Sequence, residues 1–206
     1  MFLSPKIILE GYNKGLFPMA DSFYDPFIYW VEPNVRGIIN LEEFKITRSL
    51  KKELKKKEFQ IKVNQNFEKI IRLCASNFNR KSTWINNQII ENYVKLFEIG
   101  KAKSIECFNN SELVGGLYGI TLGKIFCGES MFSLKKNSSK ISMVYLAAYL
   151  KEGNFKYIDT QFYSEHLKQF GTKKIKRKNY LDILSKYGRI KTKFPENIKK
   201  NVLEYF

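Results

Sequence analysis

The sequence is poor in the residues that bind metal ions and carry thiol chemistry. It has one histidine, His166, and three cysteines, Cys74, Cys107 and Cys127, none of which forms a CxxC pair. A structural zinc site needs about four clustered nitrogen or sulfur ligands, so we expect no metal site. A small, odd number of scattered cysteines suits a reducing compartment, where thiols stay free.

Long apolar runs are also missing. No run approaches the ~20 residues that a bilayer-spanning helix needs. Lys6 and Glu10 interrupt the opening segment, where a signal peptide would have its apolar core. We therefore expect a cytoplasmic protein that does not associate with membranes. Hydrophobic residues make up 44% of the 206 residues and aromatic residues 15%, which is enough to bury a core and argues against global disorder.

Acidic residues are scarce relative to basic ones. There are 20 Asp and Glu against 36 Lys and Arg, which gives a net charge of +16 at pH 7. Such a surplus favours a polyanionic partner, most often a nucleic acid. However, only six of the 36 basic residues are arginine, and an AT-rich genome would enrich lysine in the same way. Charge alone leaves both explanations open.

One predicted helix, between Trp30 and a predicted strand at 61–63, gathers basic residues on one face. These residues recur at helical spacing: Arg48, Lys51, Lys52, Lys55 and Lys56. A run of this kind is usually only a solvated surface. The one-sided spacing and the overall charge make binding of nucleic-acid phosphates an equal alternative.

The apolar pattern predicts an α+β fold around a central sheet, in two parts. Residues 1–62 are expected to form a small N-terminal α/β domain, with a helix and turn within 3–17 and a strand at 61–63. Residues 63–206 are expected to form the larger domain. We predict no regular structure from about Arg189 onward.

Within the larger domain the predicted elements follow one another closely. Helices are expected at 67–74 and 86–99, the second closed by Gly100, followed by strands at 104–108, 113–120 and 124–128. Next come a helix at 138–150, with Ser138 as its N-cap and Gly153 at its end, and a strand at 155–159. A short helix at 164–170 ends at Gly171.

Four segments have compositions that packing alone does not require. They are GLFPM at 15–19 with YW at 29–30, STWI at 82–85, LVGGLYG at 113–119 running into FCGESMFS at 126–133, and IDTQ at 158–161. In this order they closely resemble the leucyl/phenylalanyl-tRNA–protein transferases, from about Gly11 to Tyr180. GESMFS preceded by VGGLYG is the specific part of the resemblance.

The resemblance implies both a fold and a reaction. The larger domain would have a mixed sheet like that of acetyltransferases, and the N-terminal domain would be shorter than in longer members. The enzyme would move Leu, Phe or sometimes Met from aminoacyl-tRNA, such as Leu-tRNA or Phe-tRNA, to a protein that begins with Lys or Arg. That addition marks the acceptor for degradation by the bacterial N-end rule. An ester is exchanged for an amide, so no cofactor is required, and nothing calls for more than a monomer.

By the same resemblance, Asp159, Gln161 and Glu129 would be the catalytic residues. Asp159 and Gln161 lie two apart at a predicted strand end, so their side chains should share a face. Gln161 would accept or relay the amine proton, with Asp159 orienting and polarising it. Alternatively, both residues only position the substrates and the terminal ribose hydroxyl moves the proton. Without the resemblance, a hydrogen-bonded strand end would explain the pair.

Glu129 lies between two apolar stretches, where an unpaired carboxylate would be costly, so a partner is expected. The resemblance makes it an acidic contact that shapes the site and could meet the cationic acceptor residue. A salt bridge to one of the many lysines is the alternative.

The resemblance also assigns the substrate-binding positions. The donor side chain would enter a pocket of apolar residues: Leu117, Phe126, Met131, Met143 and Ile158. Trp30 and Trp84 would lie near the terminal adenosine of the tRNA, where stacking contributes roughly 1–3 kcal/mol per base. The basic face Arg48–Lys56 would contact tRNA phosphates. Considered alone, the apolar residues and both tryptophans would be ordinary core.

Two other classes of protein would account for part of this pattern. An acetyl-CoA-dependent acetyltransferase would share the fold, but it needs a (Gln/Arg)-x-x-Gly-x-(Gly/Ala) turn that cradles phosphate with backbone N–H groups. No such run occurs, and QFG at 169–171 falls one residue short. A non-catalytic RNA-binding protein would explain the charge, but not Glu129, Asp159 and Gln161 in family order.

Overall fold

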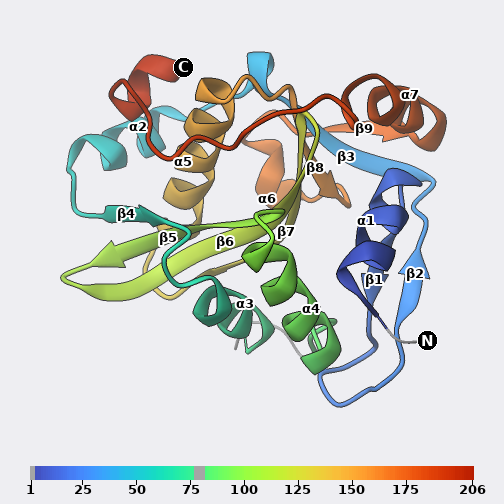
Figure 1. Ribbon diagram of the computed structural model, residues 1–206. Coiled ribbons are helices and arrows are strands. Elements are labelled where there is room, and N and C mark those ends of the chain that lie inside the picture. Colours follow the sequence, from blue (N-terminus) through green and yellow to red (C-terminus); the bar gives the residue numbers. More distant parts are fainter. Residues whose placement is uncertain (1–2, 77–81) are drawn as a thin grey trace.

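The computed structural model describes residues 3–76 and 82–206. A seven-stranded mixed sheet, in the order β4-β5-β6-β7-β8-β3-β9, runs through the molecule, and a separate two-stranded sheet lies beside it (Figure 1). The seven strands are β3 (Val35–Asn40), β4 (Gln60–Val63), β5 (Ala102–Asn109), β6 (Glu112–Leu122), β7 (Ile125–Ser133), β8 (Tyr157–Gln161) and β9 (Lys173–Lys176). The small sheet pairs β1 (Phe17–Met19) with β2 (Tyr29–Val31). This mixed architecture confirms the predicted α+β class.

Helices cover both faces of the large sheet (Figure 1). They are α1 (Pro5–Asn13), α2 (Arg48–Lys55), α3 (Phe67–Ala75), α4 (Asn87–Glu98), α5 (Ser138–Glu152), α6 (Glu165–Lys168) and α7 (Arg177–Tyr187), with 3₁₀ turns η1 (Leu41–Glu43) and η2 (Val202–Tyr205). One apolar core lies under α1, α3, α4 and α7, and a second lies under α5. In the described parts of the chain, no helix has the length and apolar composition needed to cross a membrane.

The predicted elements of the larger domain are present, several with shifted ends. β7 runs on to Ser133 instead of ending at residue 128, and β8 spans 157–161 instead of 155–159. Gly100 closes α4 as predicted: it has φ of 74°, and the amide of Lys101 reaches the carbonyl of Leu96 at 2.7 Å.

The prediction that Ser138 caps α5 is wrong. Asn137, with φ of 68°, occupies the cap position, and its side chain forms no capping hydrogen bond. The Ser138 hydroxyl lies within 2.8 Å of the Val114 carbonyl oxygen and 2.7 Å of that of Lys135, so it joins the start of α5 to β6.

The predicted boundary at residue 62 does not coincide with an edge of the sheet. β3 and β4 both precede it, and both are strands of the large sheet. β3 lies between β8 and β9 and pairs antiparallel with each. Residues 35–62 are therefore built into the same sheet as the residues that follow. The sequence pattern predicts neither β3 nor the segment formed by β9 and α7. In that segment the many lysines obscure the apolar periodicity.

Gly119 is required where β6 and β7 shift register. A Cβ atom there would lie 2.2 Å from the Cys127 carbonyl oxygen and 2.6 Å from the Phe126 ring. Its register partner Gly128 is far less confined, since a Cβ would meet only the Asp159 carbonyl oxygen, at 3.6 Å. We expect Gly119→Ala to lower the free energy of unfolding by about 1–3 kcal/mol. That change should lower the melting temperature by roughly 2–10 °C.

Gly128→Ala is the matched control for thermal denaturation, because it adds the same methyl group across the same strand pair. It should change the melting temperature by no more than about 2 °C, as expected of a substitution that meets no steric conflict. Equal losses in the two variants would contradict the steric explanation.

Candidate active site

A gap opens in the sheet where β7 and β8 separate. The two strands are parallel neighbours, and they pair only between Ile125–Cys127 and Tyr157–Asp159. Beyond these residues β7 stays with β6, and β8 stays with β3. Side chains from both sides fill the space between the diverging ends, and they leave a cavity of about 350 Å³.

Most of the cavity wall is apolar. The five residues expected to form the donor pocket all lie in it: Leu117, Phe126, Met131, Met143 and Ile158. They come from β6, β7, α5 and β8, so only the folded chain brings them together. Ser130 also lines the wall, and among the described residues its buried hydroxyl has no hydrogen-bond partner. A polar group on a bound molecule would satisfy it.

Two bulges place polar side chains beside the gap. In β7, Gly128 faces Gly119 while Ser130 faces Tyr118, so Glu129 is the extra residue. In β8, the register also shifts between Asp159 and Gln161, and Gln161 has φ of 59°. A bulge re-aims the side chains around it, and bulges are frequent next to active sites.

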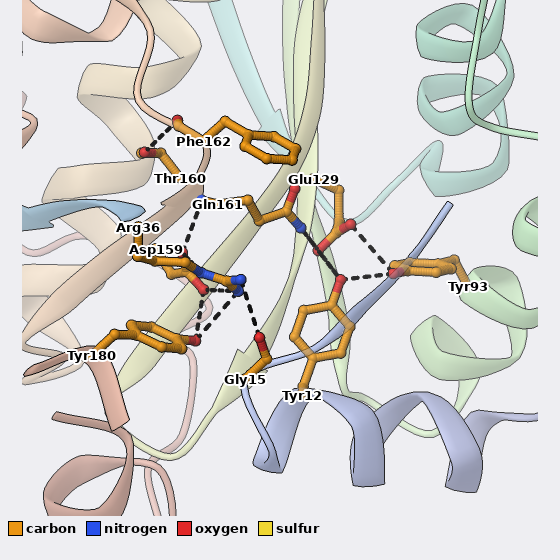
Figure 2. Close-up of polar contacts among 10 residues, drawn as sticks. All are labelled: Tyr12, Gly15, Arg36, Tyr93, Glu129, Asp159, Thr160, Gln161, Phe162 and Tyr180. Atoms are coloured by element: carbon orange, nitrogen blue, oxygen red, sulfur yellow. Dashed lines mark hydrogen bonds and ion pairs between the residues drawn. The ribbon is translucent and has the colours of Figure 1, made fainter. Parts of the chain in front are cut away.

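Glu129 is held by neutral hydrogen-bond donors. Tyr12 Oη donates to Glu129 Oε1 at 2.5 Å, Gln161 Nε2 donates to the same oxygen at 3.1 Å, and Tyr93 Oη donates to Oε2 at 3.2 Å (Figure 2). The two tyrosine hydroxyls are 2.8 Å apart. In residues 3–76 and 82–206, no lysine or arginine forms a salt bridge with Glu129.

The surroundings of Glu129 favour its protonated form. Burial raises the pKa of this carboxyl group to about 7, and the nearby charge of Asp159 acts in the same direction. Hydrogen bonds from Tyr12, Gln161 and Tyr93 partly oppose the rise because they stabilise the carboxylate. Glu129 can therefore exchange a proton near neutral pH.

Asp159 is on β8, across the gap from Glu129 on β7, and has a different environment. Arg36 Nε donates to Oδ1 at 2.9 Å and Nη2 donates to Oδ2 at 2.7 Å. Tyr180 Oη also donates to Oδ2, at 2.7 Å, and the backbone amide of Gln161 donates to Oδ1, at 2.8 Å. Asp159 and Arg36 are both almost fully buried, so this is an internal ion pair closed by further hydrogen bonds.

The Gln161 amide is oriented by its neighbours. Figure 2 shows its nitrogen turned toward Glu129 and Tyr12, with its oxygen turned away from them. No hydrogen bond from a described residue reaches Gln161 Oε1. That oxygen is the atom left to accept a hydrogen bond from a bound amine.

The two expected adenosine-binding tryptophans flank β1 and do not line the cavity. Trp30 is the register partner of Pro18, and the carbonyl oxygen of Trp84 accepts from the amide of Ala20 at 3.1 Å. Both side chains are partly exposed. Each residue is therefore partly accessible to solvent.

The five basic residues expected to contact phosphates are all exposed on or just after α2: Arg48, Lys51, Lys52, Lys55 and Lys56. α2 packs against α5 through the second core, away from α3 and α4 (Figure 1). Lys56 is partly neutralised by Glu53 at 3.0 Å. None of the five lines the cavity.

Sequence reasoning missed several residues of the site. Arg36, Tyr12, Tyr93 and Tyr180 are far apart in the chain and show no shared spacing, although Arg36 is one of only six arginines in a lysine-rich sequence. His166 lines the cavity, and burial, followed by the charge of Lys140, lowers the pKa of its imidazole.

Glu129 should take up a proton at about pH 7 in the folded protein. Tyr93→Phe removes a hydrogen bond that stabilises the carboxylate, so the pKa should rise further. Carboxyl-carbon NMR, with Glu129→Gln used to assign the signal, measures the midpoint. Tyr205→Phe is the control: it removes a hydroxyl that donates a hydrogen bond to Glu152, and it should leave the midpoint of Glu129 unchanged. A midpoint near 4.5, the ordinary value, would contradict the assignment.

Comparisons with known proteins show the family to which this sequence is similar. The family model described as leucyl/phenylalanyl-tRNA protein transferase matches residues 38–185, and the model for that family's N-terminal domain matches residues 1–34. The leucyl/phenylalanyl-tRNA–protein transferase of Paramagnetospirillum magneticum is 46% identical over 184 residues, which cover 89% of this chain and 88% of the relative. That of Maricaulis maris is 45% identical over 179 residues, covering 86% and 83%.

Among solved structures the similarity is more distant. The structure of L-PGS from Bacillus licheniformis aligns with 74% of this chain and 51% of its own, with a TM-score of 0.43 and 13% identity. The sequence matches, by contrast, span nearly the whole chain at high identity. The chain belongs to the leucyl/phenylalanyl-tRNA protein transferase family.

Proposed function

We propose that this chain transfers Leu or Phe, and in some cases Met, from charged tRNA to the N-terminal Lys or Arg of an acceptor protein. The observation that carries the proposal is the apolar cavity with Glu129 in its wall and Gln161 hydrogen-bonded to that carboxyl group. Such a cavity suits a single apolar side chain, and the polar pair suits an amine beside it. The family membership supports the same reaction.

The reaction is the aminolysis of an ester. The acceptor nitrogen attacks the carbonyl carbon of the aminoacyl ester, a C–N bond forms, the C–O bond to the ribose breaks, and the amine loses a proton while the ribose oxygen gains one. Alignment of the two reactants can contribute about 7–11 kcal/mol toward the barrier. An α-amino group has a reference pKa near ~8, so a strong base is unnecessary.

In this proposal Gln161 Oε1 accepts a hydrogen bond from the acceptor amine and so points the nitrogen toward the ester carbon. Glu129, whose pKa is raised to about 7, accepts a hydrogen bond from the other end of the amide. When the amine proton passes to Gln161 Oε1, an Nε2 proton passes to Glu129, and the reverse shift restores the amide as the leaving ribose oxygen gains the proton. Asp159 keeps the Gln161 backbone in place. Positioning of the substrates by these residues, with the ribose hydroxyl moving the proton, remains the second route within the same reaction.

The binding roles follow the same scheme. The donor side chain occupies the cavity, where a methylene difference discriminates by only ~1–3 kcal/mol, so Leu, Phe and Met are separated weakly from one another. Trp30 and Trp84 stack near the terminal adenosine, and the basic face Arg48–Lys56 contacts tRNA phosphates. The enzyme acts as a monomer in the cytoplasm and marks its acceptors for N-end-rule degradation.

The decisive experiment is transfer of radiolabelled Leu or Phe from charged tRNA to peptides that begin with Lys, Arg or Ala. Without ATP or acetyl-CoA, label should appear on the Lys and Arg peptides and not on the Ala peptide. The absence of label on every peptide, despite tight tRNA binding, would overturn the proposed function in favour of an RNA-binding protein.

A variant of the cavity wall separates binding from transfer. Met131→Asp puts an unpaired charge into an apolar wall, which costs several kcal/mol, so transfer should fall by about 100-fold or more. Affinity for uncharged tRNA should change by less than about threefold, because phosphate contacts dominate it. Met131→Leu, which conserves volume, is the control and should keep most activity. Transfer that persisted in Met131→Asp would show that the donor side chain binds elsewhere.

The basic face is tested by salt dependence. Each phosphate contact contributes roughly 0.7–0.9 to the slope of log affinity against log salt. The triple variant Lys51→Gln, Lys52→Gln, Lys55→Gln should therefore lower the slope by about 2–3. A control triple with the same loss of charge, Lys186→Gln, Lys191→Gln, Lys200→Gln, should lower it much less. Equal effects would assign the salt dependence to net charge and remove α2 from the binding surface.

A further inference from the structure

The carboxylate of Asp159 is fully engaged by the protein itself. A carboxylate offers about four acceptor sites, and Asp159 accepts four hydrogen bonds from within the chain, from Arg36 Nε and Nη2, Tyr180 Oη and the Gln161 backbone amide (Figure 2). No acceptor site is left for a substrate group or for a proton from the amine. Asp159 therefore acts on the reaction through its neighbours.

Arg36 is fixed on every side. Its guanidinium lies between the rings of Phe17 and Tyr180, with its central carbon 4.8 Å and 4.5 Å from the two ring centres. Nη1 donates to the carbonyl oxygen of Gly15 at 3.2 Å, and the side chain is only 1% exposed. A planar, bidentate and stacked contact of this kind cannot be reproduced by lysine. The cluster of Arg36, Asp159 and Tyr180 is a rigid support.

What this support holds is the backbone at Gln161. That residue has φ of 59°, in the left-handed region that L-residues avoid unless other contacts impose it. Its amide donates to Asp159 Oδ1 at 2.8 Å. β3 allows the close approach because Gly37 lacks a side chain, and a Cβ there would lie 2.4 Å from Thr160 Oγ1 and 2.8 Å from the Phe162 carbonyl oxygen.

The side-chain direction of Gln161 depends on this backbone. In the left-handed conformation Nε2 reaches Glu129 Oε1 at 3.1 Å and Tyr12 Oη at 3.4 Å, which leaves Oε1 free to accept. A return of Gln161 to extended backbone would swing the amide away from Glu129. Loss of the support should then leave the donor cavity and the tRNA-binding surface intact. It should misplace the Gln161 side-chain amide, which meets the acceptor amine.

We propose that Arg36 and Tyr180 are positioning residues of the transfer reaction: through Asp159 they hold the Gln161 backbone in the conformation that presents its amide to Glu129 and to the acceptor amine. The kinetic part of this inference rests on the proposed function. The structural part, the restraint on Gln161, does not.

Two variants test the support at different severity. Arg36→Lys breaks the bidentate contact with Asp159. Tyr180→Phe removes only one hydroxyl donor, so this milder variant can still be measured if Arg36→Lys fails to fold. Each should lower kcat by about 10- to 100-fold, since small misplacements cost on that order, with KM for charged tRNA and for peptide within about threefold. Arg72→Lys, at the exposed pair with Glu68, is the matched control and should leave both constants unchanged.

A double-mutant cycle distinguishes positioning from general weakening of the fold. If Arg36 and Tyr180 act through the Gln161 side chain, then Tyr180→Phe should lower single-turnover transfer much less in a Gln161→Ala background than in the natural enzyme. Additive losses, or a rise in KM with kcat preserved, would overturn the inference.

A readout without activity separates this inference from the proposed function. Hydrogen exchange of the Gln161 backbone amide should be slow in the natural protein and about tenfold faster or more in Tyr180→Phe, with the Ile120 amide in central strand β6 unchanged. If the natural protein transfers nothing, the proposed function fails while this measurement still decides the restraint. Unchanged exchange at Gln161 would reject it.

Discussion

The parting of β7 and β8 is the constraint on which the site depends. Parallel pairing ends at Cys127 and Asp159, and each strand then follows a different neighbour. β8 pairs with β3 along its other edge, and β3 carries Arg36, which forms a salt bridge with Asp159. Elements near the start of the described chain therefore contribute to the site: α1 supplies Tyr12, β1 supplies the ring of Phe17, and β3 supplies Arg36. A division of the chain near residue 62 would separate partners that lie in direct contact.

The two carboxylates beside the gap differ in what surrounds them. Asp159 faces a guanidinium that is stacked between two rings, and every oxygen lone pair is occupied. Glu129 faces two tyrosine hydroxyls and an amide, and its pKa is raised to about 7, chiefly by burial. The ion pair of Asp159 with Arg36 holds the backbone of Gln161. The exchangeable proton of Glu129 faces the side-chain amide of Gln161.

Much of the larger domain could be predicted from the sequence, because its elements have local signals. Gly100 and Gly153 mark helix ends, the turn at 109–112 separates two strands, and the five cavity residues follow from the resemblance to the family. The bulge in β7 leaves no such signal, since it depends on the pairing with the neighbouring strand. For the same reason nothing local predicted that Arg36, 123 residues before Asp159 in the chain, would be its partner. The sequence does not predict β9 because lysines are typical of an edge strand, and they leave no alternating apolar pattern to read.

The surplus of positive charge and the neutral surroundings of Glu129 are complementary features. A net charge of +16 lies mostly on exposed lysines, where it can attract a polyanion without entering the cavity. Arg36, the buried arginine of the described chain, is matched by Asp159. A lysine paired with Glu129 would hold that carboxyl group ionised and lower its pKa, because an opposite charge favours the charged form. Neutral donors keep the proton exchangeable near pH 7, the range in which an α-amine is also partly neutral. In the proposed reaction, the absence of a cation at Glu129, among the residues that the structure describes, therefore leaves this carboxyl group able to exchange a proton with an amine nucleophile.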